Sequence, residues 1–383
     1  MSTMVRILKL MAEKKASDVY LSAFSPATIK INGQCVPINN QALPADAPIG
    51  FLAEILTPER IEELQETGEL NMAHAIPDVG NFRISAMRQR GSYAVVIRYI
   101  QSTVPALETL NVPPILSDLI MEKRGLLLMV GATGAGKSTT LASMIDQRNS
   151  KVAGHILTVE DPVEFLFTNK KSIVNQREVG SDTNSMQIAL KNALRQAPDV
   201  ILIGEIRDRE TMSAAIAYAQ SGHLCLATMH ANNSYQALNR ILSFYPVEVR
   251  STMLDDLAGA LKAIVSQRLL RTVHGTRTPA VEVMLNTKLI SDLIAKGEFS
   301  DAKEAMEKAM VEGAQTFEQD IARLITEGII DRKEGILYAD SPTNLMWRLA
   351  NDFNAAKAAA EAVPDEVDDT PSFTEIVLDV KHS

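Results

Sequence analysis

A glycine-rich segment, Gly131-Ala-Thr-Gly-Ala-Gly-Lys-Ser138, constrains the fold more than any other feature of this sequence. It fits the phosphate-binding pattern G-x-x-x-x-G-K-[ST] at every position. The apolar run 126–130 before it predicts a buried strand, and residues 139–149 after it predict a helix. This order indicates a P-loop nucleotide-binding domain, because the N–H groups of the loop and the N-terminus of the helix both attract phosphate.

Lys137 is expected to reach the β- and γ-phosphates of ATP, and Ser138 is expected to ligate Mg²⁺. ATP and Mg²⁺ are therefore the expected ligands. The residues expected to contact the nucleotide are Gly131, Ala132, Thr133, Gly134, Ala135, Gly136, Lys137, Ser138 and Thr139.

Charge and composition argue against several other classes of protein. The formal net charge is −9, and residues 361–383 hold seven acids and one lysine, so the other 360 of the 383 residues carry only −3. Nucleic-acid-binding domains are usually strongly basic, so the near-neutral charge of residues 1–360 argues against that class. Cys35 and Cys225 are too few for a cysteine zinc site. No apolar run approaches the ~20 residues of a membrane span, and residues 1–18 lack the features of a signal peptide, so we expect a cytoplasmic protein.

Strand and helix patterns divide the chain into five parts. We predict an α/β protein with a PAS-like α+β domain at 1–100, a proline-containing linker at 101–114, a RecA-like P-loop core at 115–287, a helical region at 288–354, and an acidic, disordered tail at 355–383. Residues 373–378 are a candidate docking segment within the tail. In the first domain the predicted helices are 5–15 and 47–67, and the predicted strands are 19–22, 28–31, 35–38, 81–88 and 93–100. In the core, the strands 126–130, 155–160, 200–204 and 224–229 alternate with the helices 184–196 and 209–221 and predict a parallel sheet.

Carboxylates follow two of these strands. Glu205 ends the strand 200–204 and is expected to face Mg²⁺, directly or through water, because ligands bind at the carboxyl edge of α/β sheets. Three more acids, Glu160, Asp161 and Glu164, end the strand 155–160. Hydrolysis needs a base for the attacking water, and Glu164 is the first candidate, with Glu160 in reserve.

Two histidines flank the strand 224–229. A regular strand of this length separates His223 and His230 by about 20 Å, so both cannot contact one phosphate. His230, at the carboxyl end, is the candidate sensor of the γ-phosphate. His223 is expected to pack or to bridge subunits.

Arg83 and Arg98 lie on the last two strands of the first domain. Guanidinium groups suit a clamp on the developing charge of a phosphoryl group. These arginines are far in sequence from the P-loop, so they reach a triphosphate only by domain docking or from a neighbouring subunit. The pattern fits equally well with two solvent-exposed arginines that have no role at the nucleotide.

Five segments, 16–22, 131–138, 159–165, 202–208 and 222–230, resemble in sequence and order the motifs of the secretion-type ATPases. The resemblance is strongest to the type IV pilus retraction ATPases of the PilT and PilU type. It implies Lys137, Ser138, Glu164, Glu205 and the histidines as site residues, with Arg83 and Arg98 as the nucleotide-sensing pair. It also implies a cytoplasmic homo-hexamer that acts at the inner-membrane base of the pilus, on a platform protein.

Two departures refine the resemblance. The four-cysteine module of extension motors is missing, which favours retraction. PilT proteins carry an arginine-containing C-terminal signature, whereas the corresponding residues 289–296 of this chain, LISDLIAK, contain no arginine. Together with the acidic tail, this change favours a PilU-type accessory of a PilT-type paralogue. We therefore expect an ATP-hydrolysing motor of pilus retraction and twitching motility. The alternatives are a nucleotide-binding regulator or scaffold that needs no turnover, and a RecA-like nucleic-acid motor, against which the charge argues.

Overall fold

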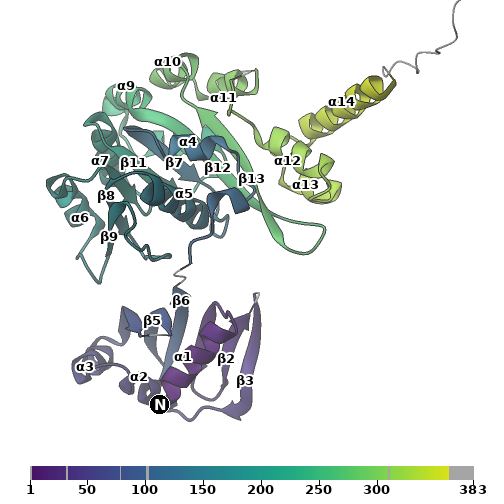
Figure 1. Cartoon of the computed structure of the whole chain (residues 1–383). Helices are drawn as coiled ribbons and strands as arrows, with labels where there is room; N and C mark the ends of the chain where they lie inside the picture. The colour runs from purple at the N-terminus through teal and green to yellow at the C-terminus, as the bar shows by residue number, and fades with distance from the viewer. Residues whose placement is uncertain (1, 32, 78, 101–102, 309–310, 362–383) are drawn as a thin grey trace, which may run out of the picture.

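The computed structural model describes residues 2–31, 33–77, 79–100, 103–308 and 311–361. Within these ranges the chain forms a six-stranded sheet, a seven-stranded sheet and a C-terminal group of helices (Figure 1). No helix among the described residues combines the length and the apolar character that crossing a bilayer requires.

The N-terminal sheet has the strand order β3-β2-β1-β6-β5-β4, and all neighbours are antiparallel. Met4, Leu8 and Met11 lie on one face of α1, and they are fully buried against apolar side chains of the sheet such as Phe82 and Ile97. The elements are α1 (Thr3–Glu13), β1 (Asp18–Ser22), β2 (Pro26–Ile31), β3 (Gln34–Ala42), α2 (Ala47–Ala53), α3 (Pro58–Thr67), β4 (Glu69–Ile76), β5 (Gly80–Gln89) and β6 (Ser92–Ile100).

Two expectations for this part were wrong or incomplete. The single helix predicted at 47–67 is two helices, because Pro58 lacks an N–H group and disfavours helical geometry at Thr57, which instead has extended angles. The strand β4 was not predicted, although its side chains alternate between more and less exposed positions. The polar His74 stands at one of the less exposed positions, and the apolar Ala73 and Ala75 stand at exposed ones, so the alternation in the sequence is broken and the strand signal is weak.

The larger sheet has the strand order β13-β12-β7-β11-β10-β8-β9. The four predicted strands, β7, β11, β10 and β8, are parallel, as predicted, and β9 and β12 extend the parallel part at either side, but β13 runs antiparallel to β12, so the sheet is mixed. The strands β9, β12 and β13 were not predicted. The strands are β7 (Gly125–Val130), β8 (Gly154–Glu160), β9 (Ser172–Glu178), β10 (Val200–Ile203), β11 (Leu224–Met229), β12 (Leu261–Arg271) and β13 (Arg277–Leu285).

Helices cover both faces of this sheet, so its central strands are buried on both sides. In β7, Leu126 and Leu128 pack in one apolar cluster, whereas Leu127 and Met129 pack in another. The helices are α4 (Ile115–Leu119), α5 (Lys137–Lys151), α6 (Met186–Ala193), α7 (Arg209–Gln220), α8 (Ser234–Ser243) and α9 (Arg250–Ala260), with short 3₁₀ turns η1 (Leu107–Thr109), η2 (Leu194–Gln196) and η3 (Val247–Val249). This layering places the carboxyl ends of β7, β8, β10 and β11 at one edge.

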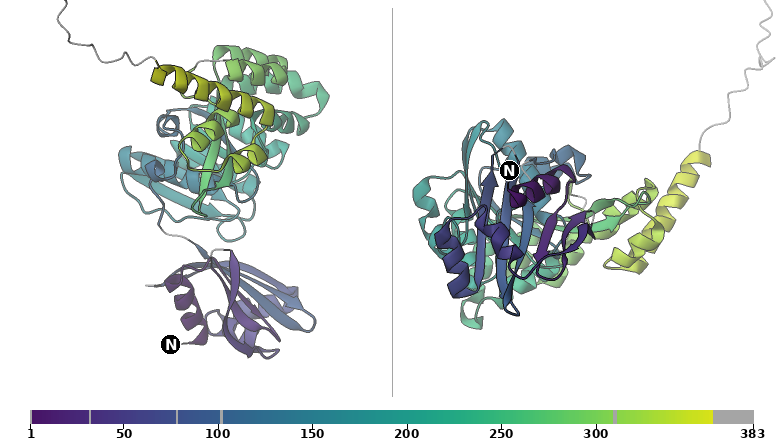
Figure 2. Two further views of the ribbon diagram at one scale, coloured as in Figure 1. Left: turned by 90° about the vertical axis from the view of Figure 1, so that its right-hand side faces the viewer. Right: turned by 90° about the horizontal axis from the view of Figure 1, so that it is seen from below.

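The C-terminal part is helical, as predicted. Its later helices pack on Leu270 and Ala280 of the β12–β13 hairpin through Phe317 and Leu345. The last helix lies far from the N-terminal sheet in Figure 1 and in the left view of Figure 2. It continues to Glu361, past the predicted start of the tail at 355. The candidate docking segment 373–378 lies outside the described residues. The helices are α10 (Lys288–Lys296), α11 (Phe299–Lys308), α12 (Phe317–Thr326), α13 (Arg332–Tyr338) and α14 (Pro342–Glu361).

Candidate nucleotide-binding site

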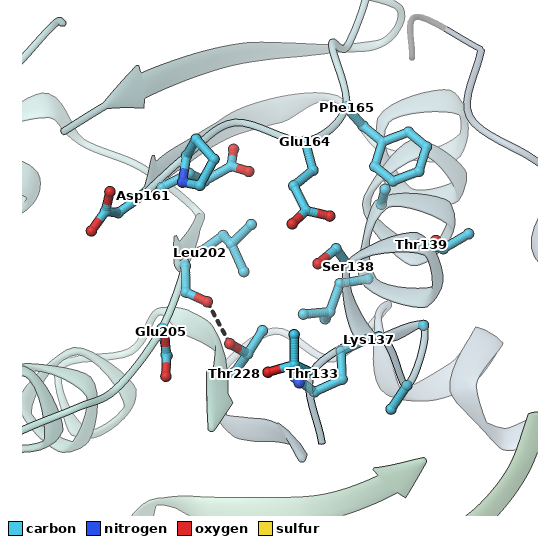
Figure 3. Close-up of a pocket in the computed structure, with 18 of the residues that line it drawn as sticks. Thr133, Lys137, Ser138, Thr139, Asp161, Glu164, Phe165, Leu202, Glu205 and Thr228 are labelled. Atoms are coloured by element: carbon cyan, nitrogen blue, oxygen red, sulfur yellow. Dashed lines mark hydrogen bonds between the residues drawn. The ribbon is translucent and has the colours of Figure 1, made fainter. Parts of the chain in front are cut away.

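A cavity of about 520 Å³ opens at the carboxyl edge of the larger sheet (Figure 3). The loop before α5 forms one wall, and the residues that follow β8, β10 and β11 form the other. The predicted site residues that line this cavity are Arg98, Thr133, Gly134, Ala135, Gly136, Lys137, Ser138, Thr139, Glu164, Glu205 and His230. Among the other predicted residues, Ala132 lines an adjoining cavity, Arg83 lines a third, and Gly131 lines none of the three.

The P-loop turns directly into α5, which begins at Lys137. Gly136 caps this helix with a φ of 86°, in the left-handed region that glycine adopts most readily. The N–H groups of the first helical turn therefore face the cavity without partners inside the helix, and together they form an anion site.

Lys137 is buried in the described structure and contacts its own loop. Its Nζ atom donates hydrogen bonds to the carbonyl oxygens of Gly131, at 2.8 Å, and Ala132, at 3.0 Å. Burial lowers the pKa of the ammonium group, and the nearby charges of Glu205 and Glu164 act in the opposite direction. The loop thus holds a desolvated cation next to the position expected for phosphates.

Glu205 lies between two cationic or potentially cationic side chains. Its Oε2 atom accepts from Nε of Arg207 at 2.7 Å, and its Oε1 atom lies 3.1 Å from Nε2 of His230. Arg207 also approaches Asp161, with 3.4 Å between Nη1 and Oδ2. The ends of β8, β10 and β11 are therefore joined by one chain of polar contacts at the edge of the cavity.

Glu164 and Glu160 lie in different environments. Glu164 is exposed and points toward Ser138 across the cavity, and its carboxylate has no hydrogen bond or ion pair within the described residues (Figure 3). Glu160 is buried and accepts from Thr158 at 2.6 Å and from Gln176 at 3.2 Å. Burial raises the pKa of Glu160 to about 7. Glu164 is therefore the carboxylate that can accept a hydrogen bond from a bound water.

The two histidines lie at opposite ends of β11. His223 is half-buried, away from the cavity, and its Nδ1 atom lies 3.1 Å from the hydroxyl of Ser221 and 3.3 Å from the carbonyl of Tyr218. His230 lines the cavity. The structure thus separates the two, as the length of the strand required.

Arg83 and Arg98 are directly opposite each other on β5 and β6. Arg98 lines the main cavity, and both line a neighbouring one of about 300 Å³ together with Glu164. Arg98 also pairs with Asp18 of β1 at 3.0 Å, where the carboxylate is 6% exposed and the arginine side chain 65%. Two adjacent guanidinium groups repel each other and are stabilised by an anion between them.

Most of the chain matches a known protein family. The family model described as type II/IV secretion system protein matches residues 4–286. The chain belongs to the type II/IV secretion system protein family. The type IV pilus ATPase PilU of Pseudomonas aeruginosa is 44% identical over 353 residues, which are 91% of this chain and 92% of PilU. The type IV pilus retraction ATPase PilT of the same organism is 34% identical, over 88% of this chain and 98% of PilT.

A solved structure agrees with these relatives. The crystal structure of the pilus retraction motor PilT with bound ADP is 34% identical, with a TM-score of 0.83 over 90% of this chain and 98% of that chain. The predicted resemblance to the PilT and PilU type of the secretion ATPase family is confirmed, and so is the α/β fold class. The PAS-like character of the first domain and the domain boundaries stay predictions.

Two polar residues of this family member were not found from its sequence. Arg207 lies two positions after Glu205, and a basic residue at that spacing was a usable signal. Gln267 of β12 donates to the carbonyl of Ala135 at 2.8 Å and accepts from Thr140 at 2.8 Å, so it fixes the P-loop from the neighbouring strand. A Cβ atom at Gly136 would lie 2.7 Å from the Gln267 amide, which explains the need for glycine there.

The buried Glu160 predicts a pH-dependent stability. Its folded-state pKa of about 7 exceeds the value of 4.5 for the unfolded chain, so the folded protein retains a proton that the unfolded chain releases in this window. The free energy of unfolding contributed by this group therefore falls as the pH rises from 4.5 through 7, by about 3 kcal/mol in total. In Glu160→Gln, which keeps an acceptor for Thr158, we expect this loss to vanish.

Chemical denaturation of the nucleotide-free protein at pH 5 and pH 8 measures this effect. The Gln variant should be more stable than wild type at pH 8 and of similar stability at pH 5. Glu66→Gln, at an exposed position in α3, is the control and should follow wild type at both values. A Glu160→Gln variant with the wild-type pH dependence would show that Glu160 is ionised in the folded protein.

Proposed function

We propose that this protein is an ATP-hydrolysing motor of the type IV pilus machinery that promotes pilus retraction as a PilU-type accessory. The observation that carries the proposal is the unpaired carboxylate of Glu164 opposite Lys137 and Ser138, in a chain 44% identical to PilU. A carboxylate across from a phosphate-binding loop has the arrangement that hydrolysis of a phosphoanhydride requires.

Binding of ATP requires Lys137 to exchange its two loop carbonyls for phosphate oxygens. The exchange is favourable because a phosphate carries full negative charge and the ammonium group is already desolvated. The N-terminus of α5 contributes further N–H groups to the same phosphates. The P-loop therefore binds ATP without a large rearrangement of the loop backbone.

Ser138 and Glu205 would hold Mg²⁺, because hydroxyl and carboxylate oxygens are the ligands that this ion prefers and both line the cavity. The bound ion supplies charge stabilisation at the phosphates. Arg207 and His230 orient the Glu205 carboxylate from either side. Glu205 would thus hold the ion directly or through one of its waters.

Glu164 acts as general base in the proposed reaction. It takes a proton from the attacking water as the new bond forms to the γ-phosphorus and the bond to the bridging oxygen breaks, which yields ADP and phosphate. Lys137 and the arginine pair Arg83 and Arg98 balance the charge that develops on the γ-phosphoryl oxygens. His230, whose Nε2 atom lies 3.1 Å from Oε1 of Glu205, faces the γ-phosphate and responds to its departure.

The proposed assembly is a cytoplasmic homo-hexamer at the inner-membrane base of the pilus. Its proposed partners are a PilT-type paralogue and a platform protein of the inner membrane. The support is membership of the family together with an arginine pair that lies on the first domain and not on the P-loop domain. Such a pair links the docking of that domain to the state of the nucleotide.

A second candidate function is a regulator or scaffold of a retraction ring that needs no turnover of its own. It is favoured by the higher identity to PilU than to PilT and by the absence of arginine from 289–296. The two functions differ in what Glu164→Gln does in cells, because that change should keep nucleotide binding and remove hydrolysis.

The decisive experiment joins biochemistry and genetics. ATP turnover and solution mass of the purified protein are measured alone and with the paralogue, and the Glu164→Gln gene is tested for rescue of twitching in a deletion strain. A hexamer that turns over ATP, with no rescue by the variant, is the expected result. Full rescue by the variant would support the scaffold, and normal retraction in the deletion strain when the paralogue is limiting would exclude both functions.

A further inference from the structure

The loop 230–233, between β11 and α8, joins the site to the rest of the molecule. At its start, Nε2 of His230 lies 3.1 Å from Glu205. At its end, Asn233 caps α8, and its Oδ1 atom accepts from the backbone N–H of Gln236 at 2.9 Å. Any group that fixes Asn232 or Asn233 therefore also limits where His230 lies.

Asp340 contacts this loop from the connection between α13 and α14. The Asn233 side chain donates to Oδ2 of Asp340 at 2.6 Å. The other carboxylate oxygen pairs with the guanidinium of Arg268 on β12, and both side chains are 17% exposed. Asp340 lies outside residues 4–286, the range that the family model matches.

Arg268 contacts both the loop 230–233 and the C-terminal helices. Its Nη2 atom donates to the carbonyl of Asn232 at 3.1 Å, and its Nη1 atom donates to the carbonyl of Tyr338 in α13. Its Cζ atom lies 3.9 Å from the centre of the Phe317 ring in α12, which holds the guanidinium plane. One cation thus binds the loop, α13 and Asp340 together.

The other side of the loop is fixed by the domain core. The buried carboxylate of Glu282 in β13 accepts from the backbone N–H of Ser234 at 2.7 Å and from the hydroxyl of Ser266 at 2.8 Å. The loop is therefore held between the sheet on its inner side and Asp340 on its outer side. Only the outer contacts come from the C-terminal helices.

The contacts of Arg268 and Asp340 are not needed to attach the C-terminal helices to the larger sheet. The apolar cluster of Leu270, Ala280, Phe317 and Leu345 already joins them to the β12–β13 hairpin. The Arg268 and Asp340 contacts end instead on Asn232 and Asn233, next to His230. Partly buried charged hydrogen bonds fix geometry more strictly than apolar contacts do.

We propose that Asp340 and Arg268 are positioning residues that hold His230 toward the γ-phosphate, so that the C-terminal helices set how well the site distinguishes ATP from ADP. The inference rests on the proposed function, in which His230 faces the γ-phosphate. It predicts that loss of Asp340 weakens contacts to the γ-phosphate and leaves contacts to ADP intact.

The test compares the affinities of the full-length protein for ADP and for a non-hydrolysable ATP analogue, both with Mg²⁺. In Asp340→Ala we expect the analogue to bind about fivefold more weakly, the effect of one lost hydrogen bond, and ADP to bind within twofold of wild type. His230→Ala should show the same selective loss. Adding Asp340→Ala to His230→Ala should cost nothing further, because Asp340 acts through His230.

Asp331→Ala is the matched control, since this residue precedes α13 and its side chain has no hydrogen bond or ion pair within the described part of the chain. Arg268→Lys serves if Asp340→Ala does not fold, because the single nitrogen of a lysine cannot occupy the two separate positions from which Nη1 and Nη2 contact Tyr338, Asn232 and Asp340. The inference alone would be overturned if Asp340→Ala weakened the binding of both nucleotides equally or of neither. It would also be overturned if Asp340→Ala weakened binding of the analogue further on the His230→Ala background. Wild-type protein that binds neither nucleotide would overturn the proposed function as well.

Discussion

Replacing Glu164 by Gln is expected to reduce ATP turnover at least about 100-fold while nucleotide affinity stays within about threefold of wild type. The carboxylate has no partner in the cavity, so its loss removes no structural contact among the described residues. An amide has the same shape but cannot accept the proton of the attacking water. Phosphate release at saturating ATP and equilibrium binding of a fluorescent nucleotide measure the two quantities separately.

The matched control is Glu210→Gln, an exposed glutamate in the first turn of α7. It should keep wild-type turnover and affinity. If Glu164→Gln turned over ATP at more than about a tenth of the wild-type rate, the base would have to be another residue. Glu160 would then be the group to test, since it lines the same cavity.

The second large effect is expected for Lys137→Ala, which should weaken nucleotide binding about 100-fold and remove measurable turnover. The ammonium group makes hydrogen bonds to charged phosphate oxygens, each of which contributes about 1.5–3 kcal/mol. Stability should change little or rise, because the variant no longer buries a charge whose pKa is lowered by desolvation. Calorimetric titration with ATP and thermal denaturation without nucleotide test both halves of the prediction.

Lys123→Ala, at an exposed position before β7, controls for the loss of a positive charge. It should bind ATP as wild type does. A Lys137→Ala protein that bound ATP normally would contradict the P-loop assignment. One that failed to bind and also melted far below wild type would show that Lys137 is needed for folding, against the electrostatic argument.

The sequence predicted best those parts of the site that are local in the chain. The P-loop, the strands that precede Lys137 and Glu205, and the separation of His223 from His230 all follow from runs of fewer than about ten residues. The common edge of the site follows from the rule that parallel strands present their carboxyl ends together. These features depend on spacing and not on tertiary packing.

The contacts of Gln267 and Asp340 with distant segments were not predicted, because nothing in the local pattern specifies them. Gln267 fixes the P-loop from more than a hundred residues away, and Asp340 reaches Asn233 from the C-terminal helices. The hairpin β12–β13 was missed for a related reason. Its strands are buried on both faces along most of their length, so they lack the alternation that marks a half-exposed strand.

The ion pair of Arg98 with Asp18 would make the proposed arginine clamp reversible. If Arg98 binds a phosphate as proposed, it leaves behind the Asp18 carboxylate, which is 6% exposed and keeps a hydrogen bond from the hydroxyl of Ser17 at 2.8 Å. A buried carboxylate without its cation is unfavourable, so Asp18 competes with the nucleotide for the same guanidinium. The competitor is built into β1 and never diffuses away. In the proposed function, Arg98 would return to Asp18 once hydrolysis removes the γ-phosphate, and this return would free the first domain from the nucleotide.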